Sequence, residues 1–162
     1  MYAQTRHTLG ARVVEALQQR LLQAPFRLFR TTQVRLSRGA VLLAIPTTFM
    51  NRSGETVETV VRKFRVPLDR LLIVHDDKDL AFGQLKLQRG RSAAGHRGVE
   101  SIIAALNSRE FWRLRIGLGA SPSRTPTEVF VLEPFASDEE RRLTATVIPQ
   151  AVQTILATVG IR

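Results

Sequence analysis

A short apolar run that ends abruptly in polar residues constrains the fold of this chain more than any other feature. Residues 71–74 are four consecutive apolar residues, and residues 75–79 are all charged or polar. Such a run is typical of a buried strand that carries polar side chains to the edge of a sheet. We therefore expect the functional edge of the sheet at residues 75–79.

Helical and strand patterns alternate along the rest of the chain, which predicts an α/β fold. We expect one domain over residues 1–162, built as a three-layer sandwich with a mixed twisted sheet and helices on both faces. Turn residues at 37–39 predict a hairpin. The expected helices are 11–22, 51–66, 98–106 and 137–159, the last with a capping box at Ser137 and Glu140 and a kink at Pro149. The expected strands are 26–36, 41–45, 71–74, 84–88, 113–116 and 128–132.

The composition favours an anionic partner and excludes thiol chemistry. Lys and Arg number 24 against 14 Asp and Glu, a formal net charge of +10, and there is no cysteine. An excess of this size attracts RNA, DNA or anionic membrane surfaces, although it also serves solubility. The first twenty residues contain no uninterrupted apolar segment of the signal-peptide kind, and the apolar runs are only strand-sized. We expect a cytoplasmic protein.

His7 and Asp76 are the candidate catalytic pair. A neutral imidazole is a competent general base near neutral pH, and a carboxylate at the end of a buried strand can hold its N–H. Taken singly, each has a simpler interpretation: His7 as a solvated terminal residue, and Asp76 as a turn or helix cap. His75 points to the opposite face if the strand continues, so we interpret it as structural.

Met50 and Asn51 lie at an expected strand-to-helix junction. The Asn51 amide can both donate and accept a hydrogen bond to a substrate, or it can cap the helix. Met50 can form an apolar wall beside a reacting group, or it can pack in the core.

Two other site types have weaker support. Asp76, Asp77 and Asp79 lack the glycine and late glutamate of a calcium loop, and the histidines lack zinc-motif spacing. The glycine-containing loop at 90–98 can bind an anion at a helix start, but it lacks the lysine-hydroxyl ending of a nucleotide-binding loop.

Several blocks of residues, in order along nearly the whole chain, together resemble the bacterial-type peptidyl-tRNA hydrolase family. Independent blocks in the right order are far more specific than one short motif. They are Tyr2 with Thr5-Arg6-His7 and Gly10; Pro46, Thr47, Thr48, Phe49, Met50 and Asn51 with Ser53 and Gly54; His75 and Asp76 with Asp79, Leu80 and Gly83; Gly95 and His96 with Gly98; and residues 113–119.

The resemblance implies a monomeric α/β enzyme that cleaves the ester between a stalled peptide and the terminal ribose of tRNA, without metal or organic cofactor. It implies that His7 is the catalytic base and Asp76 its partner. It further implies contacts to the peptide or ester from Met50, Asn51 and Tyr2, and to tRNA phosphates from Lys86 and Arg115.

The chain departs from the family pattern in two places. Family members begin with a strand and a Gly-Leu-Gly-Asn-Pro-Gly segment before the tyrosine, whereas Tyr2 is the second residue here. Either the start site is assigned too late or the protein has lost that strand. In the second case, exposed ladder groups and core surface predict low stability or aggregation. Arg97 occupies the position of a usual asparagine; it can contact a phosphate but cannot accept a hydrogen bond.

Two alternative functions follow from these departures and from the acidic cluster. One is an RNA-binding relative that does not hydrolyse its ligand, in which the basic cleft is kept and the missing amino-terminal segment has removed activity; Arg97 is a candidate substrate-binding residue. The other is a metal-dependent phosphoesterase that uses Asp76, Asp77 and Asp79.

Overall fold

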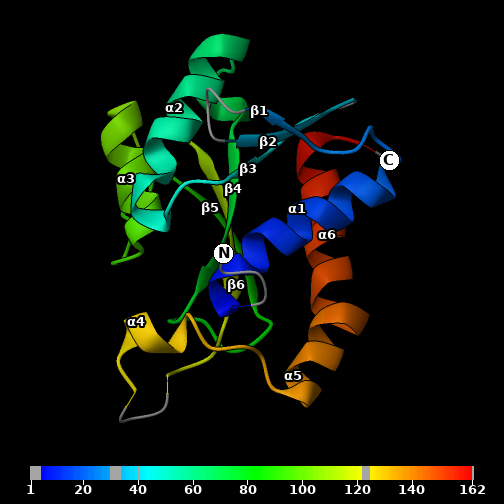
Figure 1. Ribbon diagram of the computed structural model, residues 1–162, viewed down its shortest axis with the longest axis vertical. Helices are drawn as coiled ribbons and strands as arrows, with labels where there is room; N and C mark the ends of the chain where they lie inside the picture. The colour runs from blue at the N-terminus through cyan, green and yellow to red at the C-terminus, as the bar shows by residue number, and fades with distance from the viewer. Residues whose placement is uncertain (1–4, 30–33, 40, 122–124, 162) are drawn as a thin grey trace. The chain divides into compact units, whose positions relative to one another are not determined.

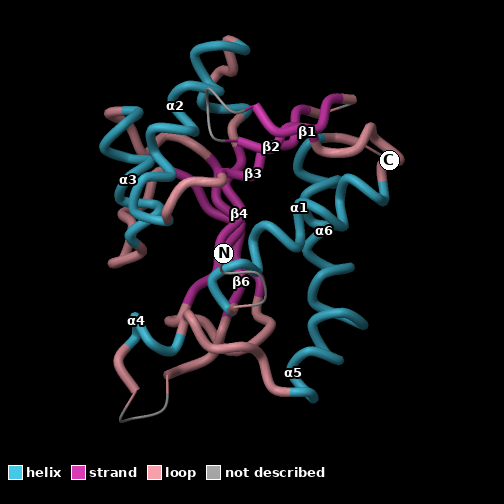
Figure 2. The backbone as a smooth tube through the Cα atoms, in the orientation of Figure 1, coloured by secondary structure: helices cyan, strands magenta, loops and turns pink. Residues whose placement is uncertain are grey.

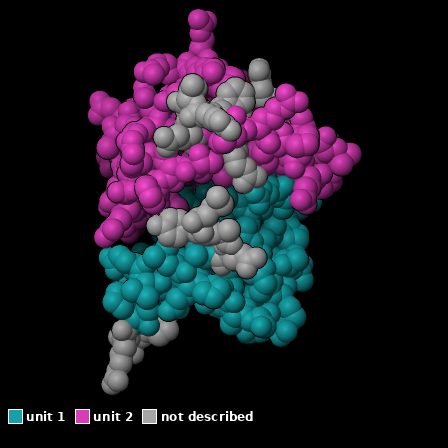
Figure 3. All heavy atoms as spheres, viewed as in Figure 1, with its two compact units in different colours: residues 1–17, 74–87, 113–162 teal, residues 18–73, 88–112 magenta. Residues whose placement is uncertain are grey.

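The computed structural model describes residues 5–29, 34–39, 41–121 and 125–161, which form parts of two compact units (Figure 3). The first unit comprises residues 1–17, 74–87 and 113–162, and the second comprises residues 18–73 and 88–112. Each unit is assembled from segments that are distant in the sequence, so neither is one continuous stretch of chain. The single domain over residues 1–162 stays a prediction.

Helices and strands alternate as the sequence predicts (Figure 1). Within the described residues, no helix is both long and apolar enough to cross a bilayer. In chain order the elements are the 3-10 helix η1 (Arg6–Thr8), α1 (Leu9–Arg20), β1 (Arg27–Phe29), β2 (Val34–Arg38), β3 (Leu42–Pro46), the 3-10 helix η3 (Met50–Arg52), α2 (Ser53–Phe64), the 3-10 helix η4 (Leu68–Arg70), β4 (Leu72–Asp77), β5 (Leu85–Arg89), α3 (Arg97–Leu106), β6 (Trp112–Gly117), α4 (Thr127–Phe130), α5 (Ser137–Arg142), the π-helical turn η5 (Leu143–Val147) and α6 (Ile148–Val159).

The strands form two three-stranded sheets among the described residues (Figure 2). One is antiparallel, in the order β1-β2-β3, and contains the predicted hairpin between β2 and β3. The other has the order β4-β6-β5. In it β6 runs parallel to β4, because the Trp112 N–H donates to the Leu71 carbonyl at 2.9 Å and, further along both strands, the Leu118 N–H donates to the Asp77 carbonyl at 2.8 Å. It runs antiparallel to β5, because Gly117 binds Gln84 before β5 whereas Glu110, before β6, lies against Arg89 at the end of β5. The α/β class and the mixed sheet are confirmed, but β1–β3 form a separate sheet.

The core of the first unit follows the apolar spacing of the sequence. Leu9, Val13 and Leu17 recur every four residues on α1 and are buried. Leu114 and Ile116 alternate on β6 and are fully buried. A period near 3.6 for the helix and of 2 for the strand brings each set to one face, which explains why these elements were predicted correctly.

The strand predicted at 128–132 is wrong. The segment forms the short helix α4, and the N–H groups of Val129 and Phe130 donate to the Pro126 carbonyl at 3.0 Å. Phe130 is buried whereas Val129 and Leu132 are exposed, so the run has no apolar face that a sheet would cover.

The predicted capping box at Ser137 is also wrong, because α5 begins there and Ala136 is the cap residue. The Glu139 carboxylate accepts the Ala136 N–H at 2.8 Å. Pro149 lies in the first turn of α6, directly after the π-helical turn η5. A wider turn is a recognised local adjustment in a helix, and here it precedes a residue that lacks the N–H of the regular ladder.

The first turn of α1 lies against the backbone of β4 at Gly10. A Cβ atom built on Gly10 would be 2.3 Å from the Val74 carbonyl oxygen and 3.3 Å from the His75 Cα. Real Cβ atoms do not approach backbone so closely, so only glycine permits this contact.

Gly10→Ala should therefore lower the free energy of unfolding by about 1–3 kcal/mol, even though the better helix propensity of alanine offsets up to about 1 kcal/mol. Urea denaturation measures the loss. Gln19→Ala, on the exposed side of the same helix, is the control and should change stability by less than about 0.5 kcal/mol. Equal stability of wild type and Gly10→Ala would contradict the close contact.

An ion pair joins β4 to β6. The Arg115 guanidinium donates through Nε to the Asp77 carboxylate, and the two side chains are 13% and 9% exposed. Burial disfavours the charged form of Asp77, but the hydrogen bonds from Arg115 and from the Asp79 N–H outweigh burial and lower the pKa of Asp77 below its ordinary value.

A lowered folded-state pKa stabilises the protein above the unfolded-state pKa of about 4, and this contribution is lost as the pH falls through the folded-state pKa. Asp77→Asn should thus cost about 1.5–3 kcal/mol at pH 7 and progressively less below pH ~4. Urea denaturation of both proteins across this pH range measures the difference. Asp79→Asn is the control, since the Asp79 side chain is 49% exposed; a pH-independent difference for Asp77→Asn would refute the prediction.

Candidate active site

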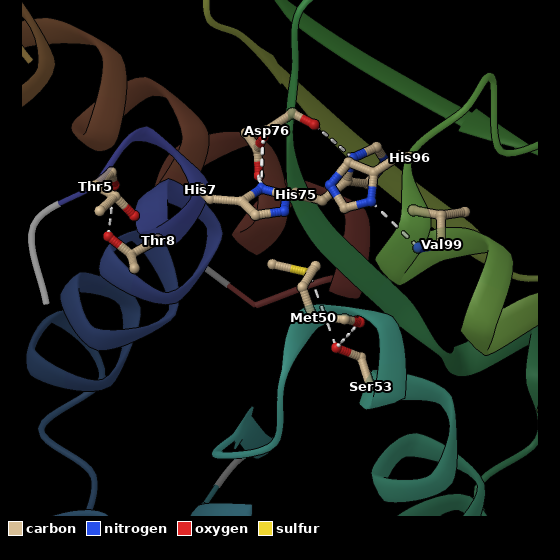
Figure 4. Close-up of polar contacts among 9 residues, drawn as sticks. All are labelled: Thr5, His7, Thr8, Met50, Ser53, His75, Asp76, His96 and Val99. Atoms are coloured by element: carbon tan, nitrogen blue, oxygen red, sulfur yellow. Dashed lines mark hydrogen bonds and ion pairs between the residues drawn. The ribbon is translucent and has the colours of Figure 1, made fainter. Parts of the chain in front are cut away.

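His7 is carried by a tight turn that opens the first unit. The Thr8 N–H and hydroxyl both donate to the Thr5 carbonyl, at 3.0 and 2.7 Å, and close the 3-10 helix η1 (Figure 4). The His7 N–H donates to the Val131 carbonyl at 2.9 Å. These hydrogen bonds therefore fix the backbone of His7 independently of its side-chain contacts.

The structure brings His7 and Asp76 together as predicted. His7 Nδ1 lies 2.9 and 3.0 Å from the two oxygens of the Asp76 carboxylate (Figure 4). We assign the donor role to Nδ1–H because an ionised carboxylate only accepts, which leaves the lone pair of a neutral imidazole on Nε2. Asp76 is 4% exposed and His7 18% exposed, so the carboxylate is buried while the imidazole has some access to solvent. This geometry suits general-base chemistry at Nε2.

The surroundings of His75 fit the structural role that we expect for it. It is buried on β4, and its Nδ1 lies 2.7 Å from the Asp76 carbonyl oxygen (Figure 4). The contact supports the backbone at the end of β4, where Asp76 must be held in place for His7.

The two predicted phosphate-contact residues differ in their surroundings. Lys86 is exposed on β5. Arg115 is largely buried on β6 and already binds Asp77 within the protein. Lys86 is thus the more accessible cation of the two.

Met50 and Asn51 belong to the second unit, where η3 follows β3. The Ser53 hydroxyl donates to the Met50 carbonyl at 2.8 Å and lies 3.9 Å from Met50 Sδ (Figure 4). A Cβ built on Gly98 would be 2.5 Å from Met50 Sδ, so the thioether rests against a residue without a side chain. Asn51 is exposed and does not cap α2, whose cap residue is Arg52.

The loop before α3 ends in a histidine cap that the sequence did not indicate. His96 Nδ1 accepts the Val99 N–H at 3.2 Å, which satisfies a donor of the first helical turn (Figure 4). Arg97 is the first residue of α3 and is exposed. Tyr2 lies outside the described residues.

The three carboxylates of the alternative metal site have separate protein partners. Asp76 binds His7, Asp77 binds Arg115, and Asp79 accepts a hydrogen bond from Lys78 at 2.8 Å. Arg115 and Lys78 are cations, which compete with a metal ion for the oxygens of Asp77 and Asp79. The imidazole of His7 beside Asp76 is itself a group that can bind a metal.

Sequence reasoning missed the residues that support His7. They are Arg6, whose side chain lies between two aromatic rings, and the segment around Phe130, Val131 and Glu139 that receives it. The partners lie more than 120 residues apart in the chain, so no local pattern linked them.

Comparisons with known proteins show the family to which the chain belongs. The family model described as peptidyl-tRNA hydrolase matches residues 1–160. A peptidyl-tRNA hydrolase of Mycobacterium marinum is 38% identical over 99% of this chain and 86% of its own length, and one of Teredinibacter turnerae is 43% identical over 86% of this chain and 75% of its own. The crystal structure of peptidyl-tRNA hydrolase from Acinetobacter baumannii superposes with a TM-score of 0.90 at 29% identity, covering 98% of this chain and 82% of that one. This chain belongs to the peptidyl-tRNA hydrolase family.

Proposed function

We propose that this protein hydrolyses the ester bond that joins a peptide to the terminal ribose of tRNA. The observation that carries the proposal is the bidentate contact of His7 Nδ1 with the buried Asp76 carboxylate. Membership of the peptidyl-tRNA hydrolase family supplies the substrate class, and a net charge of +10 suits a polyanionic ligand.

In this mechanism His7 Nε2 removes a proton from a water molecule as the water oxygen attacks the ester carbonyl carbon. Asp76 keeps the proton of the neutral imidazole on Nδ1 and stabilises the imidazolium that forms. The tetrahedral intermediate then breaks its bond to the ribose oxygen, which takes up the proton held at Nε2. One water is consumed, and a peptide with a free carboxyl group and a tRNA with a free hydroxyl are released.

The remaining predicted residues contribute binding contacts in this proposal. Met50, Asn51 and Tyr2 contact the peptide or the ester, with Met50 as an apolar wall and the Asn51 amide as a hydrogen-bonding group. Arg97 contacts a phosphate, since a guanidinium binds such oxygens in pairs and the side chain is exposed.

Lys86 is the principal phosphate contact that we propose on the first unit. Its ammonium is exposed on β5, whereas Arg115 must share its guanidinium with Asp77. We further propose that the protein acts as a monomer in the cytoplasm, where its substrate would arise during translation.

Cleavage of N-acyl-aminoacyl-tRNA in the presence of EDTA tests the function. We expect release of the N-acyl amino acid by the wild-type protein, and a fall in kcat of about 10²–10⁴-fold for His7→Ala, because the general base is lost. Asp76→Asn should fall in the same range, since an amide cannot both orient and charge-stabilise the imidazole. Gln19→Ala is the matched surface control.

Other outcomes would select the alternative functions. Binding of tRNA without cleavage would show a non-hydrolytic relative, consistent with Arg97 at a position usually occupied by asparagine. Activity only with added divalent metal would indicate a phosphoesterase that uses the acidic cluster. Full activity of His7→Ala would exclude His7 as the base.

The proposed phosphate contact predicts a change in salt dependence. Lys86→Ala should weaken tRNA binding at low salt and reduce the slope of log K against log salt concentration by about 1, the effect of one lost phosphate contact. Arg20→Ala, on the exposed end of α1, is the control cation. A slope for Lys86→Ala equal to that of Arg20→Ala would remove Lys86 from the binding surface.

A further inference from the structure

Arg6, the residue before His7, is buried although it carries a full charge. Its side chain is 8% exposed. The guanidinium carbon lies 4.5 Å from the centre of the Phe130 ring and 4.8 Å from that of Phe135. Contacts of this kind stabilise a cation out of water and hold the planar guanidinium in one orientation.

The two terminal nitrogens of the Arg6 guanidinium bind one carboxylate, whereas its Nε is buried without a hydrogen-bond partner among the described residues. Its two terminal nitrogens donate to the two oxygens of Glu139 at 3.0 and 2.7 Å, which is the paired geometry that favours arginine over lysine. The same carboxylate accepts the Ala136 N–H at the start of α5. Glu139 therefore links the side chain before His7 to the first turn of α5.

Main-chain hydrogen bonds also attach the residues before α1 to the segment before α5. The Arg6 N–H donates to the Glu133 carbonyl at 3.0 Å, and the His7 N–H donates to the Val131 carbonyl at 2.9 Å. Thr5 forms an isolated antiparallel bridge with Pro134. Three consecutive residues ending at His7 are thus held by the segment 131–134, and the Arg6 side chain extends this attachment to Glu139.

We propose that Arg6 and Glu139 are positioning residues for His7, and that their ion pair between Phe130 and Phe135 sets the rate of ester hydrolysis. The inference rests on the proposed function. Neither Arg6 nor Glu139 takes part in the chemical step. Their ion pair holds the backbone of the segment that carries the His7 imidazole. A displacement of about 1 Å at a reacting group costs about 10²-fold in rate, so loosening this support lowers kcat more than substrate binding.

A neighbouring ion pair offers a matched control. Arg12 on α1 donates to both oxygens of Glu140, the residue after Glu139. The side chains of Arg12 and Glu140 are 25% and 45% exposed, and Arg12 lies 6.0 Å from the Phe135 ring. This pair also joins the start of the chain to α5, but it is five residues beyond His7 and more open to water.

The experiment compares four variants of the full chain: Glu139→Gln, Glu139→Ala, Glu140→Gln and Glu140→Ala. Glutamine keeps the shape and one acceptor of Glu139 but removes the charge, so kcat should fall about 5-fold for Glu139→Gln and about 50-fold for Glu139→Ala, with KM within about twofold of wild type. Both Glu140 variants should keep kcat and KM within about twofold. Urea denaturation of each variant gives the fraction folded under assay conditions.

The imidazole signals of His7 provide a readout that does not depend on turnover. The chain has only three histidines, which makes ¹⁵N-labelled side-chain spectra simple to assign. We expect the Nδ1–H resonance that reports the contact with Asp76 to shift or broaden in both Glu139 variants and to remain in both Glu140 variants.

Three results would overturn the inference: unchanged kcat in Glu139→Ala, an equal fall in kcat for the Glu139 and Glu140 variants, or an unchanged His7 resonance in Glu139→Ala. If the wild-type protein cleaves no ester, the proposed function fails by itself. In that case the His7 resonance still decides whether Arg6 and Glu139 position the imidazole. Arg6→Lys, which keeps the charge but loses the paired geometry, should resemble Glu139→Gln in that spectrum.

Discussion

The close approach of α1 to β4 is the constraint on which the contact between His7 and Asp76 depends. At Gly10 the helix backbone lies so near the Val74 carbonyl that a methyl group would collide with it at 2.3 Å. Gly10 is three residues after His7, and Val74 is two residues before Asp76. The two backbones are in contact at this point. The short side chains of His7 and Asp76 are therefore long enough to meet. A larger residue at Gly10 would separate the elements and lengthen the His7–Asp76 contact.

Residues 125–136, which follow β6, contact the start of the chain at Arg6 and His7. The carbonyl of Val131 holds the His7 N–H, and the rings of Phe130 and Phe135 enclose Arg6. This segment has little regular structure, with the four-residue helix α4 and turns. The contacts of this segment with Arg6 explain its conformation. The buried Arg6 guanidinium requires both a hydrogen-bond acceptor and an apolar surface. Such a demand overrides the local propensity of the segment, which by itself favours a strand.

Close packing between α2 and α3 confines side chains within the second unit. A Cβ on Gly54 would be 2.0 Å from the Ser101 carbonyl oxygen, so α2 and α3 are in backbone contact there. The Gly54 N–H also donates to the Ser101 hydroxyl at 2.9 Å. Met50 lies before the first of these helices and rests against Gly98 in the second. The thioether, a flexible group in most settings, is thereby confined by neighbours that come from separate segments.

The sequence by itself determined the elements whose signals are local. The spacing of Leu9, Val13 and Leu17 predicts α1, and the apolar run before Asp76 predicts β4. The sequence also predicts that Asp76 holds the imidazole of His7, and the two side chains are in contact. Only the tertiary structure decided the contacts of groups whose partners are distant in the sequence. Arg6 lies against aromatic rings, Glu139 accepts hydrogen bonds from both Arg6 and the Ala136 N–H, and Arg115 is paired with Asp77. The physical reason is that apolar periodicity depends on neighbours three or four residues away, whereas a buried charge is satisfied by whichever groups the fold brings to it.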